Sequence, residues 1–116
     1  MVNLQQERLS RTFGALSDPT RRALIARLQR DGALSMSELA APFAISLPAV
    51  MKHLDLLSEA GIVLRTKEGR VVTFRLTPQP LEAAALWLDR HATFWSDSLD
   101  RLELRAAAKK RKAKRT

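Results

Sequence analysis

Residues 37–63 read SELAAPFAISLPAVMKHLDLLSEAGIV, and two helix starts lie close together, one just before this stretch and one within it. Ser35 and Glu38 have the spacing of a capping box, which predicts that a short helix begins there. Pro42 lies too far along to be a first-turn proline, so this helix should kink or end at it. Ser46 then matches the cap of a further helix.

The helix after Ser46 has an apolar side and a defined end. Pro48 fits its first turn, and Gly61 should end it, because glycine tolerates the left-handed backbone common at helix C-termini. Helical spacing predicts a buried stripe formed by Val50, Leu54 and Leu57. Two short helices joined by a tight turn are typical of a helix-turn-helix.

Two extended runs follow Gly61. Residues 62–66 and 71–76 are rich in β-branched side chains, and residues 67–70 between them include Gly69. This pattern predicts a β-hairpin with a glycine turn. A hairpin in this place would form a wing, which extends basic side chains toward the phosphates beside the major groove.

Two more helices are predicted upstream. The first spans residues 3–16, and the second begins at Asp18 and Pro19, a cap followed by a first-turn proline, and stops at Gly32. The apolar stripe of the first helix consists of Leu9, Phe13 and Leu16. The second helix is apolar at Leu24, Ile25 and Leu28.

Pro78 and Pro80 mark a break before the last predicted helix, at about residues 81–105. Its apolar positions alternate between spacings of four and three, which is a heptad seam that requires a partner helix. They are Leu81, Ala85, Leu88, Ala92, Trp95, Leu99 and Leu102. Trp87 and Phe94 widen the stripe, so we expect a second apolar surface to be covered too.

The net charge of +8 is concentrated near the end of the chain. Residues 105–116 hold seven of the 20 Lys and Arg and none of the 12 Asp and Glu, which leaves 13 basic against 12 acidic residues elsewhere. We therefore expect one nearly neutral domain, residues 1–105, and a basic flexible tail, residues 106–116. The tail is either an electrostatic DNA arm or an inert solvated end.

Several classes of protein and site are disfavoured. The chain has no cysteine, which removes disulfides, thiolate metal sites and cysteine nucleophiles. It has no long apolar run and no secretory pattern, which favours the cytoplasm and argues against a membrane partner. No Ser/His/Asp constellation or phosphate loop is apparent, so we expect neither an enzyme nor a cofactor. Three acidic residues lie at helical spacing and are expected to form a solvated face of the last helix: Asp97, Asp100 and Glu103.

The predicted elements make a mainly α winged helix-turn-helix, with four N-terminal helices, a two-stranded β-hairpin wing and a long C-terminal dimerisation helix. Residues 37–63 and residues 14–25, GALSDPTRRALI, strongly resemble the ArsR/SmtB family. The resemblance covers roughly residues 8–104, and its most specific parts are residues 46–54 and 59–63. It implies a prokaryotic homodimeric repressor whose protomers pair through the first and last helices.

The resemblance also implies which residues bind double-stranded DNA. The recognition helix would span residues 47–60 and lie in the major groove. DNA-facing positions would be Ser46, Leu47, Pro48, Ala49, Met51, Lys52 and His53, with a basic wing of Arg65, Lys67, Arg70 and Arg75. Lys52 would contact phosphate, and Leu47 and Ala49 would touch thymine methyls. His53 would donate to a phosphate or a base, or else pack against the turn.

The implied dimer interface joins the two ends of the chain. It would consist of Leu9, Phe13, Leu88, Ala92, Trp95, Leu99 and Leu102. Because a two-fold dimer requires a two-fold site, the operator is expected to be near-palindromic.

The sequence departs from the metal-sensing members of that family. Their cysteine box is absent, and Asp89 and His91 match only half of a second type of site, because Leu102 replaces its other histidine. Zinc needs about four ligands, so no metal site is expected, and His91 is read as an ordinary helix residue. Residues 94–103 instead resemble a metal-free branch, which leaves a small-molecule inducer of unknown identity.

The predicted function is therefore a sequence-specific transcriptional repressor in the prokaryotic cytoplasm, on the nucleoid when bound. The alternative is a sequence-neutral nucleic-acid-binding or helical interaction module that uses the basic tail.

Overall fold

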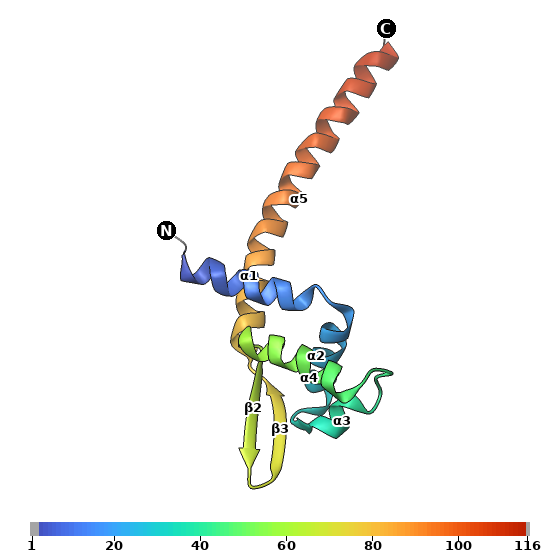
Figure 1. Ribbon diagram of the computed structural model, residues 1–116. Helices are drawn as coiled ribbons and strands as arrows, with labels where there is room; N and C mark the ends of the chain where they lie inside the picture. Colours follow the sequence, from blue (N-terminus) through green and yellow to red (C-terminus); the bar gives the residue numbers. More distant parts are fainter. Residues whose placement is uncertain (1–2, 116) are drawn as a thin grey trace. The chain divides into compact units, whose positions relative to one another are not determined.

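The computed structural model describes the backbone of residues 3–115 and the side chains of residues 3–105. The chain divides into two units, residues 1–84 and residues 85–116. The elements in chain order (Figure 1) are α1 (Leu4–Leu16), α2 (Pro19–Asp31), β1 (Leu34–Ser35), α3 (Met36–Ala40), α4 (Leu47–Glu59), β2 (Val63–Glu68), β3 (Val71–Leu76) and α5 (Pro78–Arg115). The predicted mainly α winged helix-turn-helix, with four N-terminal helices, a hairpin and a long last helix, is confirmed.

The predicted helix starts are confirmed by their capping contacts. Asp18 accepts a hydrogen bond from the Arg21 N–H at 3.0 Å and begins α2. Ser35 and Glu38 form the complete capping box of α3. The Ser46 hydroxyl accepts from the N–H of the third residue of α4 at 3.3 Å. Each cap satisfies an amide that has no partner inside the helix, which is why a local sequence signal was sufficient.

Gly61 ends α4 and directs the chain into the wing. Its φ of 73° lies in the left-handed region. This conformation lets the Ile62 N–H donate to the Leu57 carbonyl at 2.9 Å, a Schellman-type closure of the helix.

The sheet has three antiparallel strands in the order β1-β3-β2, one more than the predicted hairpin. The sequence missed β1 because it contains only two residues, and Ser35 among them also caps α3. The hairpin turn is shorter than predicted, since Lys67 and Glu68 belong to β2 and Glu68 pairs with Val71. The turn therefore consists of Gly69 and Arg70, and the φ of Gly69 is 60°.

The core of the first unit fixes α4. The predicted stripe of Val50, Leu54 and Leu57 is fully buried. It packs in one cluster with Leu24 of α2, Leu39 of α3 and Phe74 of β3, and with Ile62, which directly precedes β2. The rotation of α4 about its axis is thereby set, and with it the face that points to solvent.

The buried face of α1 differs from the predicted stripe. Leu9, Phe13 and Leu16 are only half-buried, whereas Thr12 and Ala15 are buried. The Thr12 hydroxyl donates to the Arg8 carbonyl at 3.0 Å, so its burial leaves no polar group unsatisfied.

The last helix is longer at both ends than predicted. It begins at Pro78 rather than Leu81, because the first turn of a helix has free amides and tolerates proline at both Pro78 and Pro80. It continues to Arg115, beyond the predicted end at Arg105. The side chains of the basic segment, residues 106–116, lie outside the described residues, so the flexible tail stays a prediction.

In the second unit, the heptad seam of α5 is exposed in the single chain. Leu88, Trp95, Leu99 and Leu102 expose 51–61% of their surface. The His91 ring stacks on Trp87 at 4.0 Å between centroids, and its Nδ1 donates to the Trp87 carbonyl at 2.8 Å. None of the helices in the described part of the chain is long and apolar enough to cross a membrane.

Two adjacent leucines of α4 test the core. Leu57 is fully buried, and Leu57→Ala should lower the free energy of unfolding by about 2–5 kcal/mol, because it removes apolar packing and leaves a cavity. Leu56 is 45% exposed, and Leu56→Ala should cost about 0.5 kcal/mol or less. Urea unfolding measures both variants, and equal effects would contradict the assigned rotation of α4.

Candidate nucleic-acid interface

The face of α4 opposite the core presents side chains to solvent. Pro48, Lys52 and Asp55 follow one another at spacings of four and three residues, and all three are exposed. Leu47, at the first position of the helix, exposes 55% of its surface. The N-terminal turns of such a helix can reach base edges in the major groove.

Asp55 was not singled out from the sequence. Its carboxylate shares the exposed face with Lys52, and a carboxylate in the major groove can accept from the amino group of cytosine. Asp55 was missed because basic and apolar side chains were the ones considered as DNA contacts. The three-residue spacing from Lys52 to Asp55 would have placed both on one face of the helix.

Three of the residues expected to face DNA lie on the flanks of α4. Ala49, Met51 and His53 are half-buried, and Met51 packs against the core cluster. These positions shape the edge of the helix rather than project from it. His53 has the most definite environment of the three.

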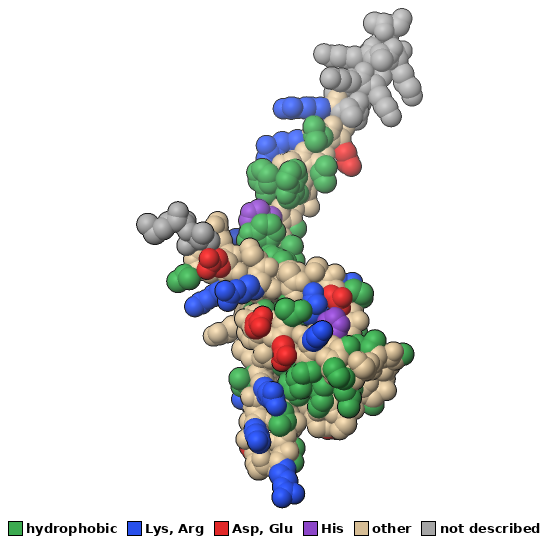
Figure 2. Space-filling model, in the orientation of Figure 1, with side chains coloured by type: hydrophobic (Ala, Val, Ile, Leu, Met, Phe, Trp, Pro, Cys, Tyr) green, Lys and Arg blue, Asp and Glu red, His purple; other side chains and the backbone are tan. Residues whose placement is uncertain are grey.

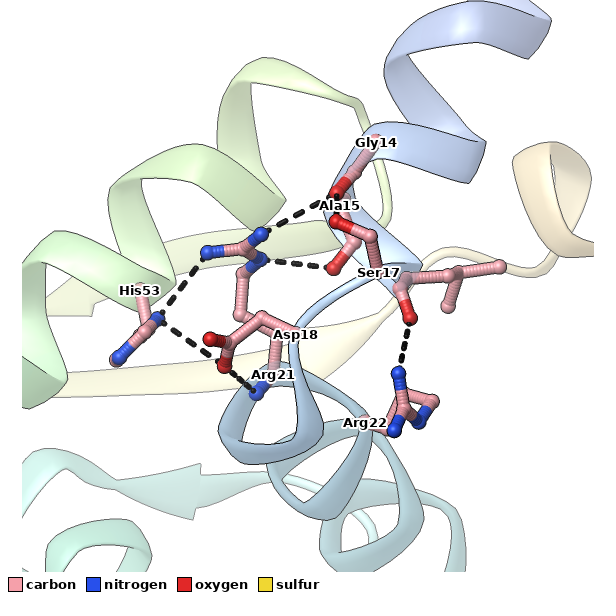
Figure 3. A network of polar contacts seen from close by, with 8 residues as sticks. Gly14, Ala15, Ser17, Asp18, Arg21, Arg22 and His53 are labelled. Atoms are coloured by element: carbon pink, nitrogen blue, oxygen red, sulfur yellow. Dashed lines mark hydrogen bonds and ion pairs between the residues drawn. The ribbon is translucent and has the colours of Figure 1, made fainter.

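His53 belongs to a polar network that joins α4 to the corner between α1 and α2 (Figure 3). Arg21 donates from Nη1 to His53 Nδ1 at 3.3 Å. The same guanidinium donates from Nε to the Ala15 carbonyl at 2.7 Å and from Nη2 to the Gly14 carbonyl at 3.2 Å. One side chain of α2 therefore connects the end of α1 with the predicted recognition helix.

Asp18 completes the network. Its Oδ2 lies 3.8 Å from His53 Nδ1. The hydrogen bond from the backbone N–H of Arg21 lowers the pKa of this carboxyl; desolvation opposes the shift, and the positive charge of Arg21 adds to it. Asp18 is therefore ionised at neutral pH, and its first role is to cap α2.

The importance of Arg21 could not be read from the sequence. Its contact with His53 spans 32 positions and depends on how the two helices pack. Arg22, the next residue, donates to the Leu16 carbonyl at 2.7 Å, so both arginines bind the last carbonyls of α1. Such contacts satisfy acceptors that the helix itself leaves open.

An open pocket adjoins this corner within the first unit. Its volume is about 470 Å³, and it is lined by Arg11, Gly14, Ala15, Arg21, Leu56, Glu59 and Ala60. Arg21 thus borders the pocket and contacts His53.

The wing carries its cations along both strands and at its tip, where Figure 2 shows several Lys and Arg side chains. Arg65, Lys67, Arg70 and Arg75 are all exposed. Arg65 pairs with Phe74 and Arg75 pairs with Leu64, so the alternation of side chains puts Arg65 and Arg75 on opposite faces. Lys67 shares the face of Arg65, and Arg70 lies in the turn.

A capped helix with one face in solvent, preceded by a short helix and followed by a basic hairpin, defines a winged helix-turn-helix DNA-binding protein. A helix-turn-helix domain family matches residues 16–66. The chain is 39% identical to the HTH-type transcriptional regulator Rv2034 of Mycobacterium tuberculosis, over 77% of this chain and 79% of that protein. It is 35% identical to the arsenical resistance operon repressor of Escherichia coli, over 66% of each.

A solved structure with a similar fold also belongs to this class of regulator. The crystal structure of the ArsR family transcriptional regulator RHA00566 matches with a TM-score of 0.72 and 41% identity, over 83% of this chain and 97% of that one. The chain belongs to the ArsR family of DNA-binding transcriptional regulators.

Metal ligands are sparse in the described part of the chain. Among the residues whose side chains are placed there, no group of three or more His, Cys, Asp or Glu could hold a metal ion.

Two substitutions on α4 separate affinity from sequence preference. Lys52→Ala should weaken binding to all duplexes alike and reduce the slope of log K against log salt by about 0.9 for each phosphate that is no longer neutralised. Leu47→Ala should instead change which sequences are preferred, because it would remove the apolar contact with the bases that we expect of this side chain. Salt titrations by fluorescence anisotropy measure the first effect and selection from random duplexes the second. An unchanged salt slope for Lys52→Ala would contradict its contact with phosphate.

Proposed function

We propose that the protein is a homodimeric repressor that occupies a near-palindromic operator and thereby blocks transcription. The observation that carries this proposal is the exposed heptad seam of α5, because an apolar row of this length is expected to pair with a second helix. A second copy of the chain supplies an identical helix. Two protomers related by a two-fold axis would then present two copies of α4 to two half-sites.

The two copies of α4 would enter successive major grooves. Leu47, Pro48, Lys52 and Asp55 lie on the exposed face and would reach the bases and the nearest phosphates, with Ser46 and Ala49 at the edge of this contact. The wing would hold the neighbouring backbone mainly through Arg65, Lys67 and Arg70. Arg75 lies on the other face of the hairpin. It would contact a phosphate of the other DNA strand or make no contact with DNA.

Selection of bound duplexes from a random library tests the proposal. We expect the enriched sequences to contain an inverted repeat with half-site centres about 10–10.5 base pairs apart, or a multiple of this. Binding of an enriched duplex should resist random competitor DNA. A sequence-neutral nucleic-acid-binding module, the rival function, would show no enrichment and would be displaced by the competitor.

A matched pair of leucines in α5 tests the dimer. Leu99 lies on the heptad seam and Leu104 lies off it, and both are more than half exposed in the single chain. Leu99→Ala should weaken dimerisation by about 2–5 kcal/mol, because the side chain becomes buried in the pair, whereas Leu104→Ala should not. Sedimentation equilibrium measures the dissociation constant. A wild-type monomer at micromolar concentration, or equal effects of the two variants, would refute the α5 interface.

The basic tail would supply affinity without specificity. We expect glutamine at Lys109, Lys110, Arg111, Lys112, Lys114 and Arg115 to flatten the salt dependence, because the slope falls by about 0.9 for each phosphate that the tail no longer neutralises. Affinity for selected and random duplexes should fall together, so their ratio should barely change. A variant that keeps the full salt slope would show that the tail is an inert end. A small-molecule inducer stays a prediction without a chemical identity.

A further inference from the structure

We propose that the neutral His53 ring donates from its Nε2–H to a DNA phosphate, and that Arg21 is the positioning residue that fixes the ring in this tautomer. This inference rests on the proposed function, in which α4 is the helix that binds DNA. Arg21 itself would not need to touch the DNA.

The tautomer follows from the chemistry of arginine. A guanidinium only donates hydrogen bonds, so the 3.3 Å contact from Arg21 Nη1 requires a lone pair on His53 Nδ1. A neutral imidazole with a lone pair on Nδ1 carries its proton on Nε2. The second ring nitrogen is therefore a donor and points away from the network (Figure 3).

The guanidinium is itself held in place. Its other two hydrogen bonds, to the Ala15 and Gly14 carbonyls, fix its plane, and the backbone N–H of Arg21 is held by Asp18. Asp18 Oδ2 is 3.8 Å from Nδ1, too far to accept a hydrogen bond from a proton on that nitrogen. Asp18 and Arg21 are the charged groups that face the ring from α2, and α1 contributes backbone carbonyls to the same network.

The position of the ring on α4 favours phosphate over base. The side chain is 23% exposed and lies on the flank that faces α2, away from the row formed by Pro48, Lys52 and Asp55. Side chains at the flank of a helix in the major groove meet the backbone that borders the groove. Base edges are met from the outward face, where only a long side chain such as Lys52 can extend past the bases to a phosphate. A donor that is held by a second side chain also loses little freedom when it binds.

Two replacements of His53 separate the roles of its two nitrogens. The amide of His53→Gln can still donate near the position of Nε2, whereas the shorter amide of His53→Asn lies near Nδ1. At pH 8, we expect His53→Asn to weaken binding about tenfold or more, as the removal of one hydrogen bond to a charged acceptor does, and His53→Gln to keep most of the affinity. The probes are a duplex enriched in the selection above and a random duplex of equal length.

The salt dependence distinguishes a neutral donor from a cation. A neutral histidine displaces no counterion, so His53→Asn should leave the salt slope unchanged, whereas Lys52→Ala should reduce it by about 0.9. A reduced slope for His53→Asn would overturn the neutral tautomer. Weaker binding of the enriched duplex alone would indicate a base contact and overturn the phosphate assignment.

Arg21→Met tests the positioning role. It should weaken binding as much as His53→Asn does, and the double variant should bind no worse than either single variant, because both changes remove the same hydrogen bond to DNA. Arg22→Met is the matched control: Arg22 also binds an α1 carbonyl but has no contact with His53 among the described residues, so DNA affinity should not change.

Thermal unfolding of each variant separates a local effect on DNA binding from a general loss of folding. Additive effects in the double variant, or an equal effect of Arg22→Met, would overturn the role of Arg21 and show that the corner is merely structural. The proposed function fails separately, if the wild-type protein enriches no duplex at all.

Discussion

The burial of one face of α4 is the constraint on which the DNA-binding surface depends. Val50, Leu54 and Leu57 cannot leave the core without exposing apolar surface, because all three are fully buried in one apolar cluster with residues of α2, α3 and the sheet. The opposite face is therefore fixed in rotation, and Lys52 points to solvent for reasons that have nothing to do with DNA. A stable core thus prepares the recognition surface before any ligand is present.

The sequence was sufficient wherever a structural feature depends on neighbours in the chain. Asp18, Ser35, Ser46 and Gly61 begin or end helices through contacts within five residues, and all four were predicted correctly. The amphipathic period of α4 was equally local. The family resemblance pointed to the same helices and to their use, and the comparisons confirmed the family.

The sequence was insufficient where packing decides. The strand β1 exists only because Leu34 and Ser35 lie beside β3, and two residues carry no period of their own. The half-buried environment of His53 depends on Arg21, and no local pattern joins them. The placement of Arg75 also required the pairing register, since composition alone makes all the wing cations look equivalent.

The contacts of Arg21 have a thermodynamic consequence. These hydrogen bonds connect the C-terminal end of α1 to the flank of α4, so a displacement of one helix would strain its contacts with the other. If α1 contributes to protomer pairing as the resemblance implies, the two equilibria share a coupling free energy. Thermodynamic linkage is reciprocal: if dimerisation raises the affinity for the operator by a given factor, operator binding raises the affinity between the protomers by the same factor. At low cellular concentration, DNA itself would then help to assemble the repressor that occupies it.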